Sequence, residues 1–79
     1  MTWTPAQRAQ KIRDMEAAVT RFDAAASTAH RTANDRTADP ETRALYARME
    51  AAHREEAAGL RATIRAVSQG AGPTAYGYR

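Results

Sequence analysis

Asn-Asp-Arg-Thr-Ala-Asp-Pro-Glu, residues 34–41, is the stretch that decides the fold, because it interrupts a helix-prone chain at its midpoint. Pro40 has no amide proton for a helix interior, and its ring moves the preceding residue, Asp39, out of the helical region. Asp39 can then cap a new helix, and Glu41 lies favourably near the positive end of the helix dipole. We therefore predict a turn at Asp39-Pro40 with a helix on either side.

The composition of the chain favours helix and provides few large apolar side chains for a core. Of its 79 residues, 43% are hydrophobic, but 20 of these are alanine. Alanine loses no side-chain entropy in a helix and buries little apolar area. β-Branched and aromatic residues never form an alternating run, so strands are not expected. The prediction is a single all-α domain.

Local signals set the outer limits of the two helices. Thr4-Pro5-Ala6-Gln7 has the residues of a capping box with proline at the first helical position. Gly70, with Pro73 shortly after it, is typical of a helix end. We expect helices near 5–36 and 40–69, with fraying at 34–37. Residues 1–70 then form an antiparallel two-helix hairpin, and residues 71–79 form a short extended tail with Gly, Pro and Tyr.

The larger apolar residues predict how the two helices pack. Facing positions of an antiparallel pair have a nearly constant sum of residue numbers, and here that sum is 78 or 79. The apolar residues keep 3-4 spacing along the first helix and form one stripe on the second. Half of the sum is about 39, where Asp39-Pro40 breaks the helix. The predicted hairpin seam consists of Ile12, Met15, Val19, Phe22, Leu45, Met49, Leu60, Ile64 and Val67.

The thin core leads to a prediction of association. Burying nine large side chains contributes much less free energy than ordering both helices costs in conformational entropy. A two-helix hairpin also leaves its seam half open. Rows of alanine, such as Ala18 and Ala25, would let another helix approach closely. We expect self-association into a homo-oligomer that completes a helical bundle, or a protein partner that covers the seam.

Charge is unevenly distributed along the chain. All nine acidic residues lie between Asp14 and Glu56, and the charged residues outside that window are all basic, in a chain of net charge +3. In a hairpin the two outer segments meet at the open end. An acidic surface is the partner that this end would fit. The predicted partner-binding residues are Trp3, Arg8, Lys11, Arg61, Arg65, Tyr76, Tyr78 and Arg79.

These patterns favour a non-enzymatic assembly or adaptor protein, such as a component of a phage particle or another large complex. A hairpin without a concave pocket is poorly suited to bind a small-molecule substrate. The alternative is a small nucleic-acid-binding regulator, since the architecture is similar to plasmid copy-control proteins that dimerise into four-helix bundles and bind RNA. A steep loss of affinity with rising salt would be the mark of that alternative.

A third hypothesis concerns metal. On a helix, Glu50-x-x-His53 places a carboxylate and an imidazole on one face. This pair resembles half of the Glu-x-x-His ligand set of ferritin-like di-iron proteins. The resemblance covers only these two residues. Opposite them the index sum places Thr28 and Ala25, which supply no further carboxylate, so no metal or cofactor is assigned.

Other features bear on location. The chain has no cysteine, which excludes disulfides and thiolate metal sites. No apolar run approaches the roughly 20 residues needed to cross a bilayer, and the N-terminal segment lacks the apolar stretch of a signal peptide. We therefore expect a cytoplasmic protein without a membrane partner.

Overall fold

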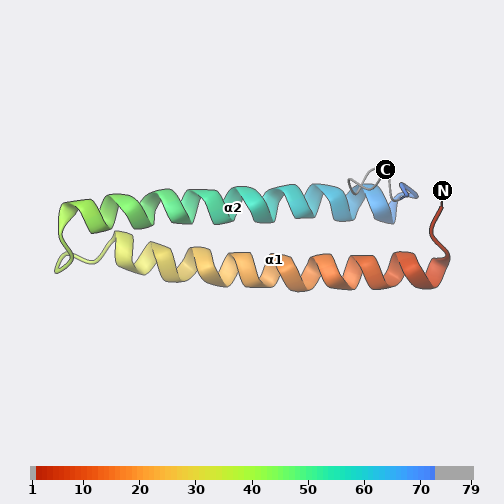
Figure 1. Ribbon diagram of the computed structural model, residues 1–79, viewed down its shortest axis with the longest axis horizontal. Helices are drawn as coiled ribbons and strands as arrows, with labels where there is room; N and C mark the ends of the chain where they lie inside the picture. The colour runs from red at the N-terminus through yellow and green to blue at the C-terminus, as the bar shows by residue number, and fades with distance from the viewer. Residues whose placement is uncertain (1, 73–79) are drawn as a thin grey trace.

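The computed structural model describes residues 2–72 and shows two antiparallel helices lying side by side (Figure 1). Helix α1 spans Pro5–Ala33 and helix α2 spans Pro40–Ser68, and this part of the chain contains no strand. The resulting rod is 52 Å along its longest axis. The predicted all-α antiparallel hairpin is confirmed.

Helix α1 begins with the predicted capping box. The backbone amide of Gln7 donates to Thr4 Oγ1 at 3.1 Å, and the amide of Thr4 donates to Gln7 Oε1 at 2.9 Å. Pro5 occupies the first helical position, where its missing amide proton leaves no hydrogen bond unmade. Two of the amides that a helix start leaves unpaired are thus satisfied locally.

Helix α1 ends at Ala33, three residues before the predicted boundary at 36. The side-chain amide of Asn34 donates to the carbonyl of His30 at 2.8 Å and so helps to close the last turn. The carboxylate of Asp35 accepts hydrogen bonds from Thr37, at 2.9 Å from its amide and 2.6 Å from its hydroxyl. These bonds lower the pKa of Asp35 and make the connection an ordered turn.

Helix α2 begins where the proline signal predicts. The carboxylate of Asp39 accepts from the amide of Thr42 at 2.9 Å and from its hydroxyl at 3.1 Å. The two bonds lower the pKa of Asp39, because they stabilise its charged form. Asp39 itself is extended, with ψ at 161°, as expected before Pro40.

The end of α2 is a glycine-dependent cap. Gly70 has a φ of +109°, which side chains of L-residues rarely allow. Its amide donates to the carbonyl of Val67 at 3.1 Å, and the amide of Ala71 donates to the carbonyl of Ala66 at 3.0 Å. This pattern is the Schellman motif. The predicted stop at Gly70 is confirmed, and the helix ends one residue before the predicted boundary at 69.

The buried core between the helices is small. Among the described residues, the fully buried apolar side chains are Met15, Ala26, Ala29, Ala57 and Val67. Ile12, Val19, Phe22, Leu60 and Ile64, all predicted for the seam, are half-buried. Three of the five fully buried residues are alanine, so most of this core contributes little apolar area.

On the first half of α2, the seam is formed by a different line of residues from the predicted one. Leu45 remains 47% exposed and Met49 38% exposed, although both were expected in the seam. Tyr46 and His53 are half-buried instead, and Ala57 is fully buried. These positions continue the seven-residue repeat backwards from the C-terminal half of α2, whereas 45 and 49 do not. Supercoiled helices keep that repeat toward each other, and periodicity here overrides side-chain size.

Candidate functional site

The open end of the hairpin was the predicted site, and Arg8 has an internal role there. Its Nη1 donates to the carbonyl of Val67 at 2.7 Å and to the carbonyl of Ala71 at 3.0 Å. The guanidinium is partly buried by these contacts and neutralises the negative end of the α2 dipole. Arg8 was predicted from the sequence to bind an acidic partner. In the structure its guanidinium has these partners within the chain.

The other arginines at this end differ in their pairing. Arg61 forms an ion pair across the hairpin with Asp23 on α1. Within residues 2–72, the guanidinium of Arg65 has no ion pair. Of these two cations, Arg65 is therefore the one whose charge is available to a partner.

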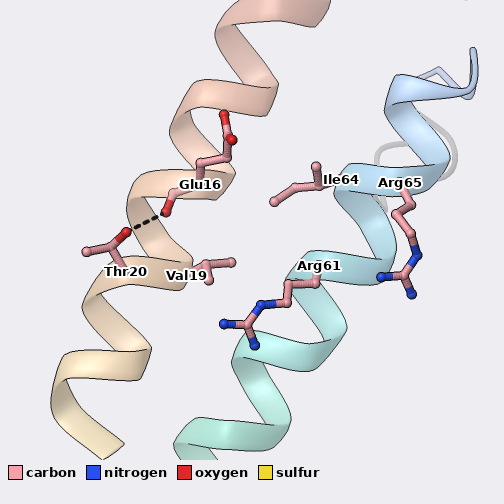
Figure 2. A pocket seen from close by; sticks show the side chains of 6 residues that line it. All are labelled: Glu16, Val19, Thr20, Arg61, Ile64 and Arg65. Atoms are coloured by element: carbon pink, nitrogen blue, oxygen red, sulfur yellow. Dashed lines mark hydrogen bonds between the residues drawn. The ribbon is translucent and has the colours of Figure 1, made fainter. Parts of the chain in front are cut away.

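Arg61 and Arg65 both line a shallow groove of about 430 Å³ between the helices (Figure 2). Helix α1 contributes Glu16, Val19 and Thr20, and Ile64 lies between the two arginines on α2. The hydroxyl of Thr20 donates to the carbonyl of its own helix at Glu16, at 3.1 Å. The groove thus combines an apolar floor with charges of both signs.

The remaining predicted partner-binding residues divide into two groups. Trp3 and Lys11 are half-buried near the start of α1. Tyr76, Tyr78 and Arg79 lie outside the described residues, as does most of the predicted tail at 71–79. The docking role of these five residues stays a prediction.

Glu50 is the centre of a polar cluster near the turn. Both of its carboxylate oxygens lie 3.0 Å from Nδ1 of His30 on α1, and Arg54 Nε donates to Oε2 at 2.9 Å. The hydrogen bond from Arg54, followed by that from His30, lowers the pKa of Glu50. Its side chain is only 18% exposed. The index sum places Thr28, not His30, opposite Glu50, so the contact with His30 differs from the prediction.

His53 is directed to the hairpin interior and away from Glu50. Its ring stacks on Phe22 of α1 with centroids 6.0 Å apart and an interplanar angle of 29°. Nδ1 lies 3.5 Å from a carboxylate oxygen of Glu56, yet this buried nitrogen has no partner with hydrogen-bond geometry. The Glu50-x-x-His53 pair therefore serves two separate contacts between the helices. In the described part of the chain, no three His, Cys, Asp or Glu side chains group as metal ligands would.

A second surface, absent from the predicted site, lies on α2 away from the seam. Leu45 and Met49 are its large apolar members, and Ala52 follows one turn later, also exposed. A hollow of about 450 Å³ borders Leu45, lined also by Glu41, Thr42, Ala44 and Arg48. The signal that would have revealed this surface is the spacing of the predicted seam. Leu45 lies 15 residues before Leu60, one more than two seven-residue repeats, so the two do not share a line of the helix.

The described chain is an antiparallel pair of helices with an exposed apolar surface on α2 and arginine side chains along the groove near its open end. Neither α1 nor α2 combines the length and the hydropathy needed to cross a bilayer. Comparison with protein-family models, with curated proteins and with solved structures finds no match.

Proposed function

We propose that the protein is a non-enzymatic interaction module whose helices associate with other helices, in the first place with copies of the same chain. The observation that supports this most directly is the exposure of Leu45 and Met49, 47% and 38%, on a hairpin with so small a core. Large apolar side chains on adjacent turns gain free energy when another surface removes them from water. In this proposal the module works in the cytoplasm as a part of a larger assembly.

Sedimentation velocity over a range of concentrations tests the proposal. The unmodified chain is expected to form oligomers, and the double variant Leu45→Glu, Met49→Glu is expected to remain monomeric with unchanged helical circular dichroism. Ala58→Glu, at an exposed position on another side of α2, is the matched control and should associate like the unmodified chain. A monomer of unmodified chain at every concentration would reject self-association.

A second candidate function is docking of the open end on an acidic protein surface. The observation in its favour is Arg65, which lines the groove of Figure 2 and has no ion pair among residues 2–72. Arg65→Gln is expected to weaken binding of a labelled polyglutamate peptide, while Arg36→Gln in the turn should not. A DNA or RNA oligonucleotide is the parallel probe. Tighter binding of the oligonucleotide with a steep salt dependence would favour the nucleic-acid alternative.

A further inference from the structure

The exposed flank of α2 has a pattern that extends the proposed self-association, on which this inference rests. Leu45, Ala52 and Gly59 recur every seven residues, so they lie along one line of the helix. All three are exposed, and the seam with α1 runs along a different line through Tyr46, His53 and Ala57. One face of α2 is thus occupied by α1, and within residues 2–72 no helix lies against this flank.

The flank is complementary to itself when its direction is reversed about Ala52. Leu45 lies seven residues before Ala52 and Gly59 seven residues after it. A second copy of α2 laid antiparallel with Ala52 on a two-fold axis therefore brings each Leu45 opposite the other copy's Gly59. A side-chain carbon built at Gly59 meets nothing within 4 Å, so the space that Leu45 would fill is open.

The charged residues of the flank are also complementary to themselves when the direction of the helix is reversed about Ala52. Arg48 lies four residues before Ala52, and Glu55 lies three residues after it on the same side of the flank. The antiparallel arrangement places Arg48 of each copy beside Glu55 of the other. Neither side chain has an ion pair within the described hairpin. Both charges are therefore available to pair across the interface.

From this shape and charge complementarity we infer that the flank of α2 is an isologous interface, occupied by the flank of a second copy in antiparallel orientation. A two-fold interface requires one patch to fit itself, with residue i facing j and j facing i. Leu45 with Gly59 and Arg48 with Glu55 meet this requirement, whereas docking of an unrelated partner would not call for it. Met49 adds apolar area at the edge, beside the aliphatic part of Glu56 in the second copy.

Cysteine cross-linking tests the position of the axis, because the chain has no cysteine of its own. A disulfide requires Cα atoms within about 7 Å, and only residues close to a two-fold axis meet their own copies at that distance. Ala52→Cys is expected to form a covalent dimer rapidly under mild oxidation. Ala58→Cys, also exposed but on another side of α2, is the control and should cross-link slowly.

Charge reversal tests the orientation. Arg48→Glu and Glu55→Arg each place two like-charge pairs across the interface, and each is expected to raise the dimer dissociation constant about tenfold. The double variant restores both pairs with reversed sign and should return the constant close to that of the unmodified chain. Each variant's helical circular dichroism serves as the measure of folding.

The outcomes separate this interface from the proposed function. If the unmodified chain is a monomer at all concentrations, both are overturned. If it associates but Ala52→Cys cross-links no faster than Ala58→Cys, self-association stands and the antiparallel α2 interface is rejected. Failure of the double charge reversal to restore association likewise rejects it. Rapid cross-linking at Ala52 together with charge rescue supports it.

Discussion

Arg8 holds the two helices together through hydrogen bonds to the carbonyls of Val67 and Ala71, at the C-terminal end of α2. Because the donor is a charged group and partly buried, each bond is stronger than a neutral one. A side chain from the second turn of α1 thus completes the cap of α2. This contact fixes the open end of the hairpin.

Removing this contact has a predictable cost. Arg8→Ala is expected to lower the free energy of unfolding by about 1.5–3 kcal/mol, the range for hydrogen bonds to charged groups. Urea denaturation monitored by circular dichroism measures it. Arg21→Ala, an exposed arginine on α1 without an ion pair in the described residues, is the control and should change stability by less than about 0.5 kcal/mol. Equal effects of the two substitutions would contradict this role of Arg8.

Gly59 and Gly70 predict opposite effects of the same substitution. Gly59 has helical backbone and open space around an added side-chain carbon, so Gly59→Ala should stabilise the hairpin by about 0.5–1 kcal/mol. Gly70 has a φ of +109°, so Gly70→Ala should destabilise it by about 1 kcal/mol or more. Both are measured by denaturation at low protein concentration, where association contributes least. A stabilising Gly70→Ala would show that the cap of α2 does not depend on this conformation.

At the scale of whole elements, the connection between the helices depends on Asp39. Its carboxylate satisfies the amide of Thr42, and alanine cannot replace that bond. Asp39→Ala is expected to lower the melting temperature by several degrees. Asp39→Asn retains a capping oxygen and is expected to have little effect. Thermal melts of both variants make the comparison, and a large loss in Asp39→Asn would assign the effect to charge and not to capping.

The helices and the turn could be predicted from the sequence because their signals are local. Thr4, Asp39, Pro40 and Gly70 act on backbone groups within a few residues, so their effect does not depend on tertiary packing. The phase of the seam on α2 is different, since the larger size of Leu45 favours one line of the helix and the seven-residue repeat favours another. Only the packing of the two helices decides between these lines.

Most of the charged pairs across the hairpin could not be predicted from the sequence. Arg61 with Asp23 and Glu50 with His30 join residues 38 and 20 positions apart, and nothing local marks them. Arg8 could have been found, because the index sum places it opposite residues 70 and 71, where a helix end leaves carbonyls unpaired. Part of the segregated charge along the chain therefore makes contacts within the molecule.

For the molecule as a whole, three carboxylates predict how stability depends on pH. Hydrogen bonds lower the pKa of Asp35, Asp39 and Glu50 in the folded state. Their contribution is present above the unfolded-state pKa of about 4 and is lost as pH falls through the lower folded-state values. The melting temperature is therefore expected to decrease when the pH is lowered below about 4.

Glu50→Gln provides the matched variant for this acid dependence. It removes one of the three titrating groups, so its melting temperature should start lower at neutral pH and fall less steeply in acid. Melts recorded from neutral to strongly acidic pH measure both slopes. Identical slopes for the variant and the unmodified chain would exclude a contribution from Glu50.

The shared cap at the open end also determines how the hairpin responds to force. The start of α1 and the end of α2 lie at the same end of the rod, so pulling on them separates the helices in an unzipping geometry (Figure 1). The load then falls on the contacts at the open end, those of Arg8 among them, before it reaches the turn at Asp39. Contacts loaded one after another resist far less than contacts sheared together. The hairpin is therefore expected to open at low force when pulled at this end, with the contacts of Arg8 contributing to the force at which opening begins.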